Sequence, residues 1–394
     1  MSKTTIRFGP WDQKKKDLEY SRCIGLYYFL NELNAVMIIS FGLSGSALNS
    51  FRFIVTIIIF LSFLRCIIHF RKNEYLSLLI TICSVTVLFI YSWLIGSKAD
   101  LLMEWGTTTL GICVPLGIFA YNICDKEVLY SVLLKFSLPV LVLLVLNLQG
   151  SQITNYDMHF SYMLLYVILF HISYILRKRK YIVIPIVLLE ILMLLVYGSR
   201  GALICIVAFI VLKVLANVES NTKRVLYIMA ALIIAFLIQY SLDNYGTSLL
   251  YQARELGFTS RSLRRILDGS VTSYDNARIY IWQNTMDLIK KSPISGYGIR
   301  GAVDYLHTSY PHQLFLDLWL SFGVIFGTMI SFMILIPSRK VFIGEYSIRK
   351  ELIQIFFCIS FVMLMVSGTV FTTYNFFIYM GLILSKTSKT TEIV

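Results

Sequence analysis

Three basic side chains in this sequence could together act on a phosphorylated substrate: Arg200, Arg278 and His312. Planar guanidinium groups bind phosphate oxygens bidentately, so two arginines that converge can hold a diphosphate without a metal ion. An imidazole at the mouth of an apolar helix can accept a proton from a hydroxyl near neutral pH. These residue types therefore predict a diphosphate-binding site beside a base that serves a hydroxyl group.

Each of these residues also has a simpler interpretation. Arg200 stands in Gly198-Ser199-Arg200-Gly201 between two apolar runs, and its stem could extend to the lipid headgroups instead of lining a site. Arg278 could be an ordinary solvated charge. His312, in Tyr310-Pro311-His312-Gln313 directly before an apolar run, could merely hydrogen-bond the first turn of a helix.

Four further residues are candidates because they are close in sequence to these three. His307 is the rival histidine in the same polar segment, and Arg300 follows a glycine-rich turn. Gln313 and Ser199 each adjoin one of the three main candidates. The polar segment has no Asp-x-Asp pair and no His and carboxylate cluster, and the chain has no Gly-x-x-x-x-Gly-Lys loop. We therefore expect no metal ion and no cofactor.

The elements that must position these residues are membrane-spanning helices. Of 394 residues, 57% are hydrophobic and only 14% charged, and the mean hydropathy is +0.73. A soluble protein of this length could not cover so much apolar surface. The sequence predicts an all-α, polytopic integral membrane protein with about 12 transmembrane helices. The apolar runs are 24–43, 51–69, 75–95, 107–124, 128–148, 158–176, 181–197, 201–216, 225–241, 314–336, 351–370 and 371–385.

The positions of Lys and Arg predict the orientation. With both termini in the cytoplasm, the cytoplasmic loops receive clusters such as Arg177-Lys178-Arg179-Lys180, whereas the opposite short loops hold only Arg52, Lys98 and Arg200. The net charge of +13 therefore reflects membrane topology, and we expect no nucleic-acid partner. The predicted organisation is a cytoplasmic tail (1–23), nine helices (24–241), a large extracytoplasmic loop (242–313), three helices (314–385) and a second cytoplasmic tail (386–394).

The loop of about 72 residues is the one long soluble segment, and we expect it to cap the outer face. It contains an amphipathic helix from Ala277 to Lys291, which Pro293 and the glycines after it should end. Within the predicted spans, Glu32, Lys135 and Glu190 are ionisable and need partners.

Three motifs in this order resemble the superfamily of O-antigen ligases and O-antigen or capsular polysaccharide polymerases of the bacterial envelope. They are Gly198-Ser199-Arg200-Gly201, then Arg278 followed by Pro293-x-x-Gly296-x-Gly298, then His312-Gln313 with Gly323 after nine residues. The motifs cover about residues 180–330, and over the whole chain the predicted topology carries the resemblance.

The resemblance implies a metal-independent, membrane-embedded glycosyltransferase in the bacterial cytoplasmic membrane. Its donor would be an undecaprenyl-diphosphate-linked oligosaccharide, with Arg200 and Arg278 binding the diphosphate and His312 activating the acceptor hydroxyl. The implied role is polymerase of repeat units in O-antigen, lipopolysaccharide, capsule or exopolysaccharide biosynthesis, with inversion at the anomeric carbon. Membrane lipids, a chain-length-regulating co-polymerase and a flippase are the implied partners.

Two alternatives stay open. A ligase would transfer the finished glycan from the same donor to lipid A core or to a protein. The modest loop, the short tail and the lack of an added soluble domain favour the polymerase. A lipid-linked oligosaccharide flippase or transporter is the alternative of a different class, but such proteins often have two related halves and a midplane site. Here the halves look unlike and the candidate residues are at the outer edge.

Overall fold

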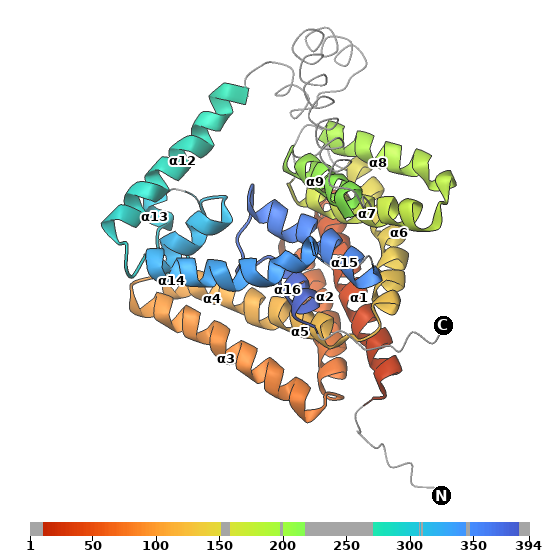
Figure 1. Cartoon of the computed structure of the whole chain (residues 1–394), viewed down its shortest axis with the longest axis horizontal. Coiled ribbons are helices and arrows are strands. Elements are labelled where there is room, and N and C mark those ends of the chain that lie inside the picture. Colours follow the sequence, from red (N-terminus) through yellow and green to blue (C-terminus); the bar gives the residue numbers. More distant parts are fainter. Residues whose placement is uncertain are drawn as a thin grey trace, which may run out of the picture.

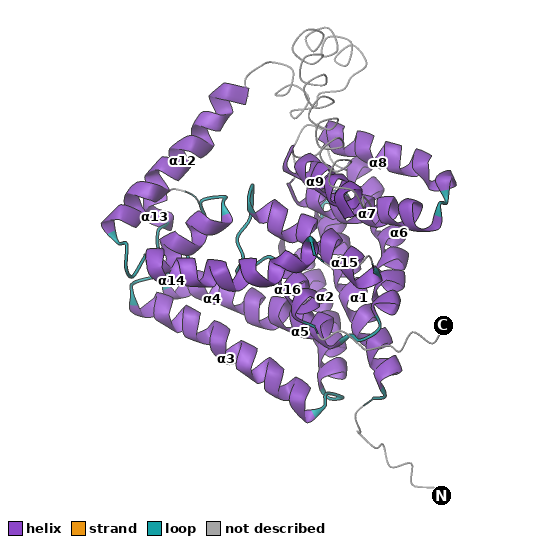
Figure 2. Cartoon of the chain, viewed as in Figure 1, coloured by secondary structure: helices purple, strands orange, loops and turns teal. Residues whose placement is uncertain are grey.

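The computed structural model describes residues 11–150, 158–197, 200–216, 271–306, 308, 310–343 and 347–385. Within these ranges the protein is built from helices and contains no strand (Figure 2). This result agrees with the predicted all-α fold.

The helices follow one another along the chain as shown in Figure 1. The first half contains α1 (Gln13–Ile39), α2 (Gly45–Ile67), α3 (Lys72–Leu94), α4 (Ala99–Thr108), the π-helix η1 (Thr109–Cys113), α5 (Val114–Asn122) and α6 (Lys126–Gly150). They are followed by α7 (Met158–Lys178), η2 (Tyr181–Val183), α8 (Ile184–Tyr197), α9 (Arg200–Ala216), α12 (Val271–Lys291), α13 (Val303–Leu306), α14 (Leu314–Ser338), η3 (Arg339–Val341), α15 (Ile348–Phe356), η4 (Phe357–Val362) and α16 (Tyr374–Leu384).

Six helical segments of the described chain are long and apolar enough to cross a membrane. They are α2, α3, the continuous rod from α4 to α5, α6, α7 and α14 with η3. The apolar segments in α8, α9 and α16 are shorter. The protein is therefore an integral membrane protein with several helical spans, and the total of about 12 stays a prediction.

Burial separates the helices that face lipid from those that form the core. In the most apolar windows of α2 and α3 only 17% and 11% of residues are buried, against 67% in α7. Large apolar side chains such as Phe60 and Leu94 are 62% and 72% exposed. Such a surface suits hydrocarbon and would be unfavourable in water. α7 therefore lies inside the bundle, where it packs against α6, α8 and α9.

Two of the three ionisable residues that were predicted to need partners, Glu190 and Glu32, have them. Glu190 on α8 accepts a hydrogen bond from His171 on α7 at 2.7 Å, and both side chains are buried. Glu32 on α1 lies 3.1 Å from Nε2 of His159. The third residue, Lys135, is exposed on α6. Pairing inside the bundle removes the cost of isolated charges at membrane depth.

α12 lies at the edge of the molecule, with α13 beside it and α14 next to both (Figure 1). The predicted helix over 277–291 is confirmed, although it begins earlier, at Val271. Its end at Lys291 is the predicted one, because Pro293 and the turn after it do not continue the helix.

The predicted apolar face of α12 is buried only at its C-terminal end. Leu288 and Ile289 pack against Leu306 and Leu320, whereas Ile279 and Met286 are 44% and 40% exposed. Within the described residues, the apolar cluster that α12 shares with α13 and α14 therefore involves the last turns of α12. The predicted span 225–241, most of the loop before Val271, and the end regions 1–10 and 386–394 lie outside the described residues.

Candidate active site

A break in α14 positions the loop that precedes it. Gly323 has φ 73° and ψ 172°, a conformation that L-residues rarely adopt, and it interrupts the helix about three turns from its start. The break frees backbone groups, which the turn after α12 satisfies. Tyr297 and Gly298 donate their N–H groups to the carbonyls of Leu320 and Ser321, both at 2.8 Å, and Val324 donates to Pro293 at 2.7 Å. The turn and the broken helix therefore form one unit.

Two glycines allow this close approach. A Cβ added at Gly296 would lie 2.5 Å from the backbone nitrogen of Gly323, and a Cβ at Gly323 would lie 2.1 Å from the carbonyl oxygen of Ile294. Both distances are far below any van der Waals contact. The Pro293-x-x-Gly296-x-Gly298 motif and Gly323 thus have a shared structural function, which is to seat the turn in the break of α14.

His312 lies on the loop that leads into α14, in the left-handed region with φ 58°. Its ring is partly buried, with the Tyr310 ring edge-on at 4.5 Å between centroids. The residue that hydrogen-bonds the first turn of α14 is Gln313, whose side-chain oxygen accepts from the Leu316 N–H at 2.6 Å. His312 is therefore not the helix cap, and its buried Nδ1 has no partner within the described part of the chain. A non-glycine residue held in a strained conformation with a free ring nitrogen is typical of a functional group.

Arg278 on α12 acts electrostatically on His312. Burial lowers the pKa of the His312 imidazole, and the positive charge of Arg278 lowers it further. One turn along α12, Trp282 donates its indole N–H to the carbonyl oxygen of Pro311 at 3.0 Å, which ties this helix face to the loop. The imidazole is consequently neutral at pH 7, which is the form that can accept a proton.

Arg300 lies in the turn between α12 and α13. It too has a left-handed backbone, with φ 58°, and its guanidinium stacks over the Trp105 ring at 4.9 Å. Its NH1 group forms an ion pair with Glu104 on α4. The Trp105 and Tyr310 rings lie 6.4 Å apart, so an unbroken row of contacts joins Arg300 to His312.

For the remaining predicted site residues, the structure describes either the backbone alone or nothing. Arg200 is the first residue of α9, and its side chain lies outside what the structure describes. Ser199 and His307 are outside the described residues altogether. Of the predicted set, the structure therefore connects His312 with Arg300 through two aromatic rings and with Arg278 through its charge, and Gln313 serves as the cap of α14.

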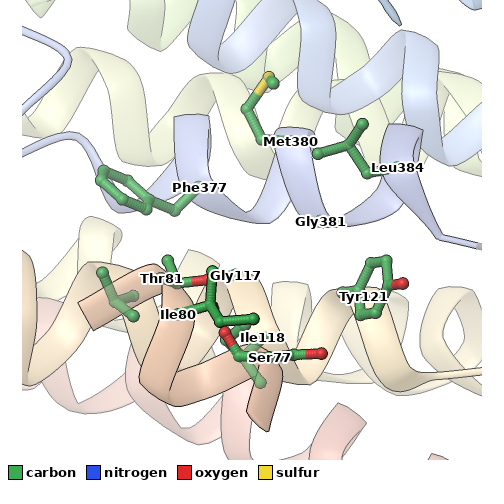
Figure 3. Close-up of a pocket in the computed structure, with 11 residues that line it drawn as sticks. Ser77, Ile80, Thr81, Gly117, Ile118, Tyr121, Phe377, Met380, Gly381 and Leu384 are labelled. Atoms are coloured by element: carbon green, nitrogen blue, oxygen red, sulfur yellow. Dashed lines mark hydrogen bonds between the residues drawn. The ribbon is translucent and has the colours of Figure 1, made fainter. Parts of the chain in front are cut away.

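An apolar cavity of about 650 Å³ adjoins this cluster. Trp282 and Gln313 form its end near His312, and it continues along α14 past Thr328 to Leu335. A second cavity, of about 310 Å³, lies between α3, α5 and α16, where Gly117 and Gly381 cross (Figure 3). Phe377 and Met380 face Ile80 and Thr81 across it. None of the candidate site residues lines this second cavity, so it is a feature of helix packing away from the site.

The cluster thus offers a neutral imidazole, an arginine on α12 whose charge acts on it and a second arginine that is joined to it through two aromatic rings. An apolar cavity leads away from it along a membrane helix. Comparison with known families decides which class of protein carries this arrangement. A family model described as O-antigen ligase matches residues 185–331. Residues 185–331 are therefore similar to the O-antigen ligase family, which supports the superfamily that the three motifs resemble. No curated protein and no solved structure matches the chain.

The O-antigen ligase segment covers the candidate residues but not their whole surroundings. Its range includes α8, α9, α12, α13 and most of α14, and hence Arg200, Arg278, Arg300 and His312. The match indicates an enzyme of O-antigen ligase or polymerase type, whose members are glycosyltransferase-like.

Residues outside the O-antigen ligase segment complete the site, and sequence reasoning missed them. Ser92 on α3 accepts the Ile299 N–H through its hydroxyl at 3.0 Å, and Glu104 and Trp105 on α4 contact Arg300. In the sequence, only the positions of Ser92, Glu104 and Trp105 could have indicated this role. They lie on either side of the short loop that contains Lys98, and this loop was predicted to be on the same side of the membrane as Arg200.

Proposed function

We propose that this protein polymerises lipid-linked oligosaccharide repeat units, as in O-antigen, capsule or exopolysaccharide synthesis. The donor is a growing glycan on undecaprenyl diphosphate, and the acceptor is a hydroxyl of the next lipid-linked unit. The observation that carries the proposal is the partly buried His312 imidazole, which is neutral, has an unpartnered Nδ1 among the described residues and lies within electrostatic reach of Arg278, a cation of the kind that binds phosphate. The superfamily match supports the general reaction type.

The chemistry follows from these groups. The acceptor hydroxyl attacks the anomeric carbon from the face opposite the diphosphate and passes its proton to the His312 ring. The bond between the anomeric carbon and the phosphate oxygen breaks, and its electron pair leaves with the lipid diphosphate. Arg278 and Arg200 stabilise the negative charge that develops there. Because the diphosphate is itself the leaving group, the reaction needs neither a nucleotide nor a metal ion, and it inverts the anomeric carbon.

The membrane placement is part of the proposal. About 12 spans with both termini in the cytoplasm would put the 242–313 loop, Arg278 and His312 at the outer face of the bacterial cytoplasmic membrane. The apolar cavity beside Trp282 and Gln313 would then accommodate part of the polyprenyl chain while the diphosphate stays at the surface. A flippase that delivers the donor and a co-polymerase that sets chain length are the expected partners.

The test is the glycan made by a strain in which the native gene is replaced by a His312→Asn variant. Asparagine tolerates the left-handed backbone of this position but has no group that titrates near neutral pH. His69→Phe, at an edge-on ring contact with Trp11, serves as the control histidine. Both variants must be present in the membrane at the wild-type level.

We expect His312→Asn to leave single repeat units where the wild type and His69→Phe give a ladder of chain lengths. Full-length chains that accumulate on the lipid carrier would instead identify a ligase. A normal ladder from His312→Asn would refute the role of this histidine and would favour a transporter.

A further inference from the structure

Arg300 is fixed in place more firmly than a surface arginine. Its side chain is only 10% exposed and lies over the Trp105 ring at 4.9 Å. The backbone next to it is anchored, because Ile299 donates its N–H to the Ser92 hydroxyl at 3.0 Å. The strained left-handed conformation of Arg300 is thus maintained by contacts on α3 and α4.

The anion that pairs with Arg300 is held much more loosely. The Glu104 side chain is 66% exposed, and it engages the NH1 group of the guanidinium. The Nε atom of Arg300 is buried and has no partner within the described residues. A guanidinium has five N–H donors in a planar fork, and here part of that fork is unused. The arrangement is a preformed cation with a removable counter-ion.

This cation belongs to the same site as His312. Trp105 contacts Arg300 on one side and Tyr310 on the other, and the Tyr310 ring lies 4.5 Å from the His312 ring. Arg278 approaches the same imidazole from α12. Two arginines from different elements are thus connected to one histidine, Arg278 through its charge and Arg300 through two aromatic rings, and a ligand with two phosphate groups needs two such cations.

We propose that Arg300 binds the diphosphate of the lipid-linked donor and that Glu104 is its resting counter-ion, which the diphosphate displaces. This inference rests on the proposed function and extends it to a residue on α4, outside the family segment. The carboxylate keeps the guanidinium paired while the site is empty. When a phosphate takes its place, two of its oxygens can accept hydrogen bonds from NH1 and NH2, the end-on pair of the guanidinium.

The test measures binding of inorganic diphosphate to the purified full-length protein in neutral detergent by isothermal titration calorimetry. Glu104→Gln should bind diphosphate about two- to fivefold more tightly, because the competing exposed ion pair is removed. Arg300→Lys, which keeps the charge but loses the planar fork, should bind it about tenfold more weakly. In the Arg300→Lys background, Glu104→Gln should have a smaller effect than in the wild type.

A matched control separates this exchange from general electrostatics. Lys98 and Asp304 form a neighbouring ion pair at 2.7 Å, with both side chains more than half exposed. Asp304→Asn removes the same charge as Glu104→Gln and should leave the affinity unchanged. An equal gain from Asp304→Asn, or a Glu104→Gln variant that binds no more tightly than the wild type, would overturn the proposal.

Glycerol phosphate, titrated in parallel, represents the phosphate of a phospholipid headgroup. If Glu104→Gln increases the affinity for diphosphate but not for glycerol phosphate, the site belongs to the donor. An equal increase in the affinity for glycerol phosphate would overturn that assignment. The titration is independent of glycan synthesis. Its failure is therefore distinct from a normal ladder in His312→Asn, which would refute the proposed role of His312 and leave an anion site at Arg300 standing.

Discussion

Gly296 packs directly against Gly323, so closely that a Cβ on Gly296 would lie 2.5 Å from the Gly323 nitrogen. This contact joins the turn after α12 to the break in α14 and thereby sets the positions of Arg300 and His312 on either side. Three backbone hydrogen bonds between the two segments depend on it.

Gly323→Ala should therefore destabilise the protein and abolish most of its activity. The positive φ and extended ψ of Gly323 form a conformation that is essentially restricted to glycine, and it costs an alanine roughly 1–3 kcal/mol. Overlap with Ile294 adds to this. We expect a lower thermal unfolding temperature of the purified protein and a shortened glycan ladder. Gly111→Ala is the control, because a Cβ there has no atom within 4 Å. If both variants behave alike, the contact between the two glycines has no special importance.

The acid side of the pH-activity profile should report the His312 imidazole. A protonated imidazole cannot accept a proton, so activity should fall as the pH drops through its pKa. Burial and Arg278 place that pKa below the ordinary value of 6.5. Arg278→Gln removes the positive charge, so the pKa should rise and the acid limb should move to higher pH, in addition to any loss of donor binding.

The control for this shift is Lys290→Gln on the same helix. Lys290 is exposed and pairs with Asp287 at 2.9 Å, and its substitution should leave the profile unmoved. The measurement is the initial rate of polymerisation by purified protein in liposomes at saturating donor, from pH 5 to pH 8. An acid limb that stays in place in Arg278→Gln would contradict the electrostatic coupling between the two residues.

Local patterns in the sequence predicted the elements of the site well. Pro293 predicted the end of α12 at Lys291, because proline lacks the N–H that the helix needs there. The apolar run from Leu314 predicted α14, and the residues before it predicted a loop with a histidine at the helix mouth. These features depend only on neighbouring residues, so the sequence alone was enough.

Contacts between distant segments could not be predicted in the same way. The pairing of Arg300 with Glu104 joins α4 to the turn after α12, and only the folded chain brings them together. The sequence shows how far apart Gly296 and Gly323 are along the chain. It does not show that the two glycines pack against each other in the folded protein. Exposure of Ile279 and Met286 likewise depends on how far α14 reaches along α12, which helical periodicity does not record.

Filling the apolar cavity along α14 should impair use of the lipid-linked donor. Thr328 lines this cavity, about one turn beyond the break at Gly323. Thr328→Trp would occupy space that we assign to the polyprenyl chain. Because the tryptophan would exclude the lipid chain from this space, we expect polymerisation at limiting donor to fall about tenfold, which corresponds to about 1.4 kcal/mol of donor binding.

Met333→Trp is the matched control for this substitution. Met333 is on the same helix, does not line the cavity and is 70% exposed, so a tryptophan there should face lipid. Both variants should keep the wild-type thermal unfolding temperature and the wild-type affinity for inorganic diphosphate, which has no apolar chain. A loss of rate in Thr328→Trp with short-chain and full-length donors alike would mean that the cavity does not hold the lipid. A loss only with the full-length donor follows if the chain lies along α14, because only a long chain would reach Thr328.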